Sequence, residues 1–337
     1  MRHFTLGDAR VQPGRRATVD LPVSTLSNHA HVTLPVHVVH GEAPGPVLFL
    51  SGAIHGDEIQ GVEIIRRILT HPALDGLRGT LLAVPIVNSF GFLNHTRYMP
   101  DRRDLNRCFP GSDRGSLASL VADIFFREVV LKSNFGIDFH TAALHRTNLP
   151  QVRLAPEEPE LLKLAQAFAP PVILISKLRE RSLRLTAGEA GVKVLLYEGG
   201  EALRFDEHAI DAAVKGTLRV MAYLGMTEPQ PRKAGSGTVF SDASAWVRSP
   251  ESGILHTTRR SGDRVGKGEI VGVVADPLGQ ASLPLFAEFD GIIVGSTNLP
   301  LVNRGDAVFH IARAMPLASI RQHPEEAASL ADEDEII

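Results

Sequence analysis

Between residues 47 and about 226, short apolar runs alternate with segments of helical periodicity. The apolar runs end in polar residues or glycines, which is typical of buried strands, and they lie at 47–50, 79–88, 135–140, 172–176 and 193–198. In the segments between them, apolar residues recur every three or four positions, which predicts helices at 58–70, 116–132, 158–168, 183–190 and 206–225. The alternation predicts an α/β fold with a mostly parallel or mixed sheet sandwiched by helices.

Strand patterns without helices flank this central part on both sides. The first 40 residues or so alternate between polar and apolar positions, and glycine turns separate short apolar strands from about 238 to 312. We therefore expect N-terminal strands plus an α/β domain, a linker, a smaller all-β barrel-like domain and an acidic tail, at 1–228, 229–237, 238–315 and 316–337.

Composition is that of an ordinary soluble protein and points to no charged macromolecule as a partner. The chain has 337 residues, 44% hydrophobic and 22% charged, with a formal net charge of −3. This charge gives no electrostatic reason to expect nucleic acid or an anionic membrane as a partner.

The single cysteine, Cys108, excludes an intrachain disulfide framework. We find no secretory signal and no apolar run of the ~20 residues that span a bilayer. We therefore expect a cytoplasmic protein. Apolar strands of the β-domain could pair between chains, so the sequence is compatible with a homo-oligomer as well as a monomer.

The strongest chemical signal follows the first predicted strand of the α/β region. His55 and Glu58 lie three positions apart, where that strand gives way to a helix. At this spacing an imidazole and a carboxylate can point to one side of the turn and bind a metal such as zinc, given a third protein ligand. Alone, the pair is a weak signal, and a helix start whose acidic residues complement the helix dipole explains it better.

Other polar residues stand where further predicted strands end. His140 ends one strand, with Asp138 two residues before it as a carboxylate that could orient a metal-bound imidazole. Glu198 ends another strand, followed by two glycines that would let a substrate approach the backbone. In a polar loop, Asn106 and Arg107 form a natural clamp for a substrate carboxylate. Functional residues gather beyond the carboxyl ends of parallel strands, so these groups are expected near one another.

Taken in order, four motifs resemble the succinylglutamate desuccinylase/aspartoacylase family, which belongs with zinc carboxypeptidases of the carboxypeptidase A type. They are His-Gly-Asp-Glu from His55 to Glu58, Asp-Leu-Asn-Arg at 104–107, the strand-end His140, and Glu198 with its two glycines. The resemblance covers about 45–226, and a C-terminal β-domain is also typical of that family.

The resemblance implies one zinc ion per chain, held by His55, Glu58 and His140 with water in the fourth position. It also implies that Glu198 acts as the general base and proton shuttle. By the same resemblance, Asn106 and Arg107 would hold a carboxylate of the substrate.

Arg97 resembles the family's arginine that polarises the scissile carbonyl. The segment 100–103 is longer than in aspartoacylases, however, so Arg102 or Arg103 is an alternative for this role. Arg146, just beyond the strand end at His140, is a further candidate to line the substrate pocket.

The expected function is therefore a zinc-dependent hydrolase that removes the acyl group from a small, carboxylate-bearing N-acyl amino acid. One alternative is a metallocarboxypeptidase that trims short peptides. Another is a non-catalytic zinc-containing binding protein, which would be expected to lack a ligand or the base, whereas His55, Glu58, His140 and Glu198 are all present. The sequence does not identify the acyl group or the amine.

Overall fold

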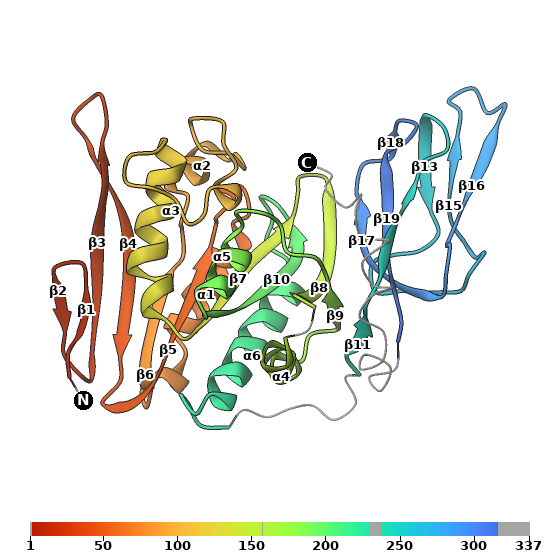
Figure 1. The fold of residues 1–337 in the computed structure, drawn as a ribbon. Helices are drawn as coiled ribbons and strands as arrows, with labels where there is room; N and C mark the ends of the chain where they lie inside the picture. Colours follow the sequence, from red (N-terminus) through yellow and green to blue (C-terminus); the bar gives the residue numbers. More distant parts are fainter. Residues whose placement is uncertain (1, 157, 230–236, 316–337) are drawn as a thin grey trace.

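In the part of the chain that the structure describes, 13 strands form one large mixed sheet (Figure 1). The computed structural model describes residues 2–156, 158–229 and 237–315. Most of the predicted linker and the whole acidic tail at 316–337 lie outside these residues. None of the described helices is long and apolar enough to cross a membrane.

The centre of the sheet is parallel, as the sequence predicts. Four neighbouring strands run in one direction, in the order β10 (Lys193–Glu201), β7 (Phe135–Ala142), β5 (Ala43–Gly52) and β6 (Arg78–Val84). Beyond β6 the sheet continues with antiparallel strands, β4 (His31–His40) and then β3 (Arg15–Thr25). A separate hairpin near the N-terminus consists of β1 (Phe4–Leu6) and β2 (Ala9–Val11).

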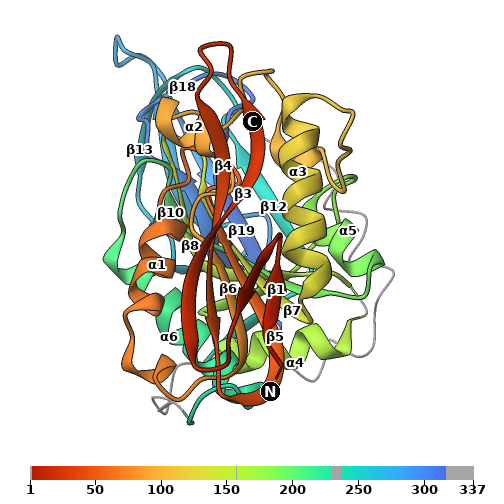
Figure 2. The same ribbon diagram turned by 90° about the vertical axis from the view of Figure 1, so that its left-hand side faces the viewer.

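Helices cover both faces of this sheet, which confirms the predicted fold class (Figure 2). Residues of one face pack against α1 (Gln60–Leu69), α4 (Pro159–Phe168) and α6 (Glu207–Tyr223). Residues of the other face pack against α3 (Leu117–Glu128) and α5 (Leu183–Glu189). The shorter helices are α2 (Ser89–Asn94), η1 (Pro72–Leu74), η2 (Leu105–Arg107) and η3 (Val130–Lys132).

The continuous apolar runs follow from this arrangement. Leu48 and Leu50 of β5 belong to the core on the α1 side, whereas Phe49 between them belongs to the core on the α3 side. All three side chains are fully buried. Successive residues of a strand point to opposite faces, so a strand with helices on both faces needs apolar residues at consecutive positions.

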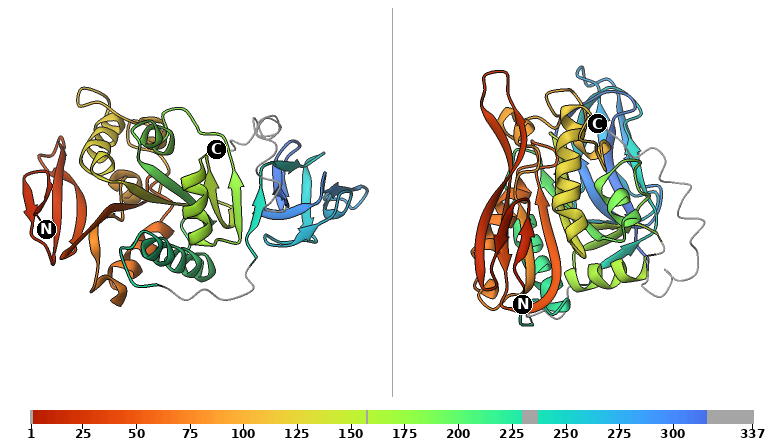
Figure 3. Two further views of the ribbon diagram at one scale, coloured as in Figure 1. Left: turned by 60° about the horizontal axis from the view of Figure 1, so that its bottom comes forward. Right: turned by 60° about the vertical axis from the view of Figure 1, so that its left-hand side comes forward.

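The C-terminal region is all-β, as predicted, and part of it forms a separate antiparallel sheet. That sheet contains β16 (Ser282–Phe286), β15 (Ile270–Ala275), β13 (Gly253–Thr257) and β18 (Leu301–Val302). Figure 3 shows this sheet and the N-terminal strands at opposite ends of the molecule. The remaining C-terminal strands are β11 (Val239–Ser241), β12 (Ser244–Arg248), β14 (Arg264–Val265), β17 (Gly291–Thr297) and β19 (Ala307–Arg313).

The C-terminal region also extends the large sheet, a feature that the sequence did not predict. The connection runs through β8 (Arg146–Leu154), which pairs with β10 on one side and β17 on the other, with β19 and β12 following. A further strand at this junction, β9 (Val172–Ile175), pairs with both β8 and β11. Because β17 adds directly to β8, the α/β and all-β regions share one hydrogen-bonded sheet.

Candidate active site

The loop after β5 carries the first two candidate ligands and is tied to the loop after β6. The carbonyl oxygens of Gly52 and Ala53 accept hydrogen bonds from the backbone of Val87 and Asn88, at 3.1 and 2.9 Å. A Cβ atom at Gly56 would lie 2.0 Å from the backbone carbon of Gly91, so the two loops can approach this closely only with glycine at that position. These contacts fix the direction in which the loop presents its side chains.

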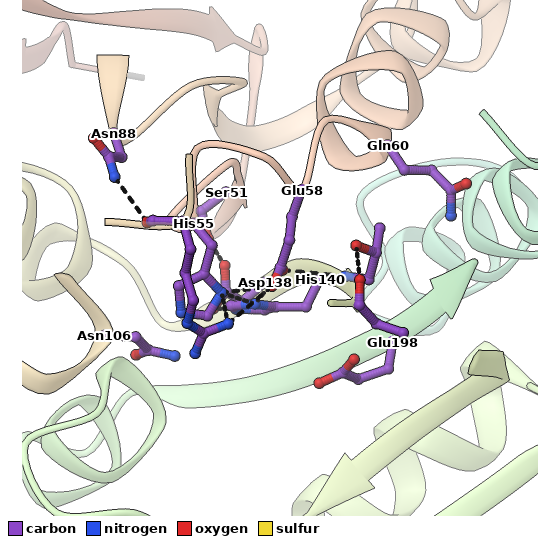
Figure 4. A network of polar contacts seen from close by, with 12 residues as sticks. Ser51, His55, Glu58, Gln60, Asn88, Asn106, Asp138, His140 and Glu198 are labelled. Carbon is purple, nitrogen blue, oxygen red and sulfur yellow. Dashed lines mark hydrogen bonds and ion pairs between the residues drawn. The ribbon is translucent and has the colours of Figure 1, made fainter. Parts of the chain in front are cut away.

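Three buried side chains converge at this point (Figure 4). One oxygen of the Glu58 carboxylate lies 2.6 Å from His55 Nδ1, and the other lies 2.8 Å from His140 Nδ1. The two Nδ1 atoms are 3.2 Å apart. Candidate ligand atoms from all three residues lie within 4.8 Å of one another.

The outer nitrogen of each imidazole faces a carboxylate. His140 Nε2 lies 2.7 Å from Asp138 Oδ2, as the sequence suggested, and Ser51 donates a hydrogen bond to the other Asp138 oxygen. His55 Nε2 lies 3.2 Å from Asp104 Oδ1. Such partners fix the tautomer and ring orientation of metal-binding histidines, and here they leave both Nδ1 atoms for a metal. Asp104 stands in the predicted Asp-Leu-Asn-Arg motif, but the sequence gave it no role.

The electrostatics of this cluster favour a cation. Burial alone would raise the pKa of Glu58, but the neighbouring His55 and His140 lower that pKa well below its usual range. Burial alone would lower the pKa of His140, yet Asp138 and Glu58 raise it well above 6.5. Two imidazole nitrogens, one carboxylate and oriented outer nitrogens match the donors of catalytic zinc sites. His55, Glu58 and His140 therefore form a metal-binding triad of the kind that suits zinc.

Glu198 enters the site from the neighbouring strand. It lies opposite His140 in the parallel pairing of β10 with β7. Its Oε2 accepts a hydrogen bond of 2.9 Å from Asn148 Nδ2, and its Oε1 lies 4.0 Å from Arg153 Nε. Asn148 belongs to β8, the strand that the sequence reading missed.

The two glycines after Glu198 have a local structural reason. A Cβ atom at Gly199 would lie 2.7 Å from the hydroxyl oxygen of Tyr197. Gly200 has a φ of +74°, and a Cβ atom there would lie 2.8 Å from Gln60 Oε1. The expected role of these glycines in admitting substrate is therefore not needed to explain them.

All eight residues predicted for the site line one cavity of about 210 Å³. They are His55, Glu58, Arg97, Asn106, Arg107, His140, Arg146 and Glu198. Seven cationic side chains contribute to the lining, namely Arg97, Arg107, Arg146, Arg153, Lys177, Arg179 and Arg184. The alternatives Arg102 and Arg103 are exposed and are not among the described residues that line it.

Arg97 lies beside the triad. Its Nη2 donates a hydrogen bond of 2.9 Å to Asp104 Oδ2, and its Nη1 lies 3.3 Å from His55 Nδ1. Asn106 is held by its side-chain oxygen, which accepts a hydrogen bond of 2.9 Å from the backbone of Leu183. This leaves the amide nitrogen of Asn106, a donor, as the atom suited to a carboxylate.

The all-β region also reaches the cavity. Trp246 of β12 lines it, and the Arg146 guanidinium lies over the Trp246 ring at 5.2 Å from the centroid. On the neighbouring strand, His310 stacks against Trp246 with ring centroids 4.6 Å apart and an interplanar angle of 10°. The sequence did not indicate Trp246 as a site residue, because its place depends on the pairing of β17 with β8.

Comparisons with known proteins agree with this geometry. Residues 44–224 match the succinylglutamate desuccinylase/aspartoacylase catalytic domain. The chain is 30% identical, over 317 residues, to N-alpha-acetyl-L-2,4-diaminobutyric acid deacetylase from Halomonas elongata, covering 88% of this chain and 90% of that protein.

Two solved structures have the same fold over most of their length. A succinylglutamate desuccinylase/aspartoacylase from Rhodobacter sphaeroides is 26% identical with a TM-score of 0.78, over 89% of this chain and 96% of that one. A succinylglutamate desuccinylase from Silicibacter sp. TM1040 is 25% identical with a TM-score of 0.79, over 89% and 95%. The chain therefore belongs to the succinylglutamate desuccinylase/aspartoacylase family, and it is an amide hydrolase that deacylates N-acyl amino acids.

Proposed function

We propose that this deacylase depends on one zinc ion per chain, for which His55, Glu58 and His140 are the ligands. The observation that carries the proposal is the convergence of His55 Nδ1, His140 Nδ1 and the Glu58 carboxylate, with Asp104 and Asp138 on the outer ring nitrogens. When bound, zinc supplies a Lewis acid that polarises a carbonyl and lowers the pKa of a bound water to about 7.

Glu198 is the general base of this proposal. It takes one proton from the attacking water while the water oxygen bonds to the acyl carbon of the substrate. The carbon–nitrogen bond then breaks, and Glu198 returns the proton to the leaving amine, so that one water and one amide give a carboxylic acid and an amine. Support for this role comes from its position opposite His140, on the neighbouring strand.

Arg97 donates hydrogen bonds to the acyl oxygen as negative charge develops there. Its position beside the triad, within 3.3 Å of His55 Nδ1, supports this assignment over Arg102 and Arg103. Asp104 orients Arg97 as well as His55, since its two carboxylate oxygens contact one side chain each.

The substrate is a small N-acyl amino acid that carries a carboxylate. Asn106 and Arg107 bind this carboxylate, and Arg146, which lies over the Trp246 ring, adds a third donor to the cavity. A volume of about 210 Å³ lies below the roughly 300–1,000 Å³ of pockets for drug-sized ligands, which favours an acyl amino acid over a peptide. The relative from Halomonas elongata is named for such a substrate, N-acetyl-diaminobutyric acid.

The first test is metal content and its effect on amine release. Elemental analysis of the purified protein should give about one zinc per chain, and a chelator should abolish activity that added zinc restores. A His140→Ala variant should lose both the metal and the activity. Full activity in protein stripped of all metal would overturn the zinc assignment.

The second test is amine release from a panel of N-acyl amino acids and short peptides, with Glu198→Gln as the control. Hydrolysis of an acyl amino acid by the wild type alone supports the proposal and identifies the acyl group and the amine. Cleavage of peptides without hydrolysis of any acyl amino acid would instead favour a carboxypeptidase. Undiminished activity of Glu198→Gln would remove Glu198 from the role of base.

A further inference from the structure

The hydrogen bond between Asn148 and Glu198 joins the candidate base to β8, a strand that the sequence did not predict. Asn148 is 9% exposed, and its Nδ2 lies 2.9 Å from Glu198 Oε2. The guanidinium of Arg153 is also near, but its Nε lies 4.0 Å from Glu198 Oε1, which is too far for a hydrogen bond. The direct constraint on the direction of this carboxylate therefore comes from Asn148.

The chemistry of the two groups sets the orientation of the amide. An ionised carboxylate only accepts hydrogen bonds, so the amide nitrogen of Asn148 must face Glu198 and the amide oxygen must point elsewhere. In the structure that oxygen lies against Gly295 of β17, which is directly opposite Asn148 in the pairing of β17 with β8.

Gly295 provides the space that this amide occupies. A Cβ atom added at Gly295 would lie 2.8 Å from Asn148 Oδ1, closer than real Cβ contacts, whereas its next neighbours are 3.4 Å away. The backbone of Gly295 does not have the positive φ that favours glycine. An alanine at this position would therefore leave the strand in place and displace the Asn148 side chain.

We propose that Asn148 is a positioning residue that orients Glu198 for proton transfer, and that Gly295 of the C-terminal region holds Asn148 in place. With Oε2 bound to Asn148, the Oε1 atom of Glu198 carries the proton between water and the leaving amine. This inference rests on the proposed role of Glu198 as the base. It gives the C-terminal strand β17 a part in catalysis without contact with the substrate.

The first experiment compares kcat, KM and zinc content in variants of these residues. Asn148→Ala should lower kcat by roughly 10- to 100-fold, because small misplacements of catalytic groups cost up to about 100-fold, while KM and zinc content stay unchanged. Asn148→Asp keeps the size but removes the donor, so it should lose at least as much kcat. A kcat within twofold of wild type in either variant would overturn the proposal.

Gly295→Ala should reproduce the loss of kcat, although this residue touches neither substrate nor zinc. Ser296→Ala is the matched control, because Ser296 follows on the same strand and points to the opposite face of the sheet. We expect wild-type kinetics from it. Unchanged kcat in a folded Gly295→Ala protein would show that Gly295 does not hold Asn148.

A double-mutant cycle separates this role from general destabilisation. Once Asn148 is alanine, the methyl group at position 295 has nothing to displace, so Asn148→Ala with Gly295→Ala should be no slower than Asn148→Ala alone. Losses that multiply would contradict the proposal.

The Glu198→Gln variant distinguishes failure of this inference from failure of the proposed function. If Glu198→Gln keeps wild-type turnover, the proposed base is wrong. If Glu198→Gln is inactive while Asn148→Ala is unimpaired, only the inference about Asn148 fails.

Discussion

His140 Nε2 lies 2.7 Å from Asp138 Oδ2, two residues earlier on the same strand. Side chains two positions apart on a strand point to the same face, so β7 itself supplies both the candidate ligand and the group that orients it. Ser51 of β5, next to β7, holds the second oxygen of Asp138 at 2.7 Å. The orientation of His140 is therefore fixed by the centre of the sheet, before any metal binds.

Replacing Asp138 by asparagine should weaken zinc binding by about 10- to 100-fold, the usual effect of losing such a carboxylate. Competition with a chelating indicator would measure this affinity. Asp123→Asn is a matched control, because Asp123 pairs with Arg127 on α3 and is not among the described residues that line the cavity. Equal zinc affinity in Asp138→Asn and wild type would mean that Asp138 does not orient the ligand.

Arg97→Ala should lower kcat by about 10²- to 10³-fold, the typical loss when one donor to a developing oxyanion is removed. Arg103→Ala should leave kcat unchanged, because its side chain is 56% exposed and its nearest partner is Asp101 at 3.5 Å. Steady-state kinetics of the two variants would decide between them. A large loss in Arg103→Ala with none in Arg97→Ala would support the alternative that the sequence left open.

Trp246→Ala should raise KM and leave kcat nearly unchanged. The Arg146 guanidinium lies 5.2 Å from the centre of the Trp246 ring, and such a contact contributes roughly 0.5–2 kcal/mol. Losing it should raise KM by about 2- to 30-fold, since about 1.4 kcal/mol corresponds to tenfold. Trp246→Phe retains a ring face, so its KM should lie between those of wild type and Trp246→Ala. An unchanged KM in Trp246→Ala would contradict a role for this contact in binding.

Much of the site could be predicted from sequence because its signals are local. His55 follows β5 by three residues, and His140 and Glu198 lie near the carboxyl ends of β7 and β10, which a parallel sheet places at one edge. Glu58 lies within the same turn as His55. The order of the motifs along the chain then sufficed to reveal the resemblance to a known family. The pairing of β10 with β7 was still needed to place Glu198 opposite His140.

The parts of the site that the sequence did not predict depend on strand pairings between segments far apart in the chain. β8 was not predicted, because Pro150 lies within it and its buried positions include the polar residues Asn148 and Gln151. Without β8, nothing in the sequence brings β17 or Trp246 toward the cavity. The contact between Gly295 and Asn148 spans 147 positions (295 minus 148), a distance at which local patterns carry no information.

Protein stability should depend on His310 at acidic pH. Burial, followed by the nearby charge of Arg153, lowers the pKa of His310 from 6.5 to about 3. Neither ring nitrogen has a hydrogen-bond partner among the described residues, and the side chain is 2% exposed. The folded protein therefore holds this ring neutral over a range in which the unfolded chain binds a proton.

The sign of the effect follows from proton binding. Between pH 6.5 and pH 3 the unfolded state binds more protons at His310, so the free energy of unfolding falls as the pH decreases through this range. At about 1.4 kcal/mol per pH unit, His310 should make the free energy of unfolding about 2 kcal/mol lower at pH 5 than at pH 7.5. His310→Phe keeps the stack on Trp246 and removes the titrating nitrogens, so it should lack this part of the pH dependence.

Urea unfolding of wild type and His310→Phe at pH 5 and pH 7.5 would measure the difference. Protonation of His55 and His140 affects both proteins alike and cancels in the comparison. At pH 7.5 the variant should be at least as stable as wild type, since the replaced nitrogens make no hydrogen bond with any described residue. Equal losses of stability on acidification in the two proteins would show that His310 is not held neutral by the fold.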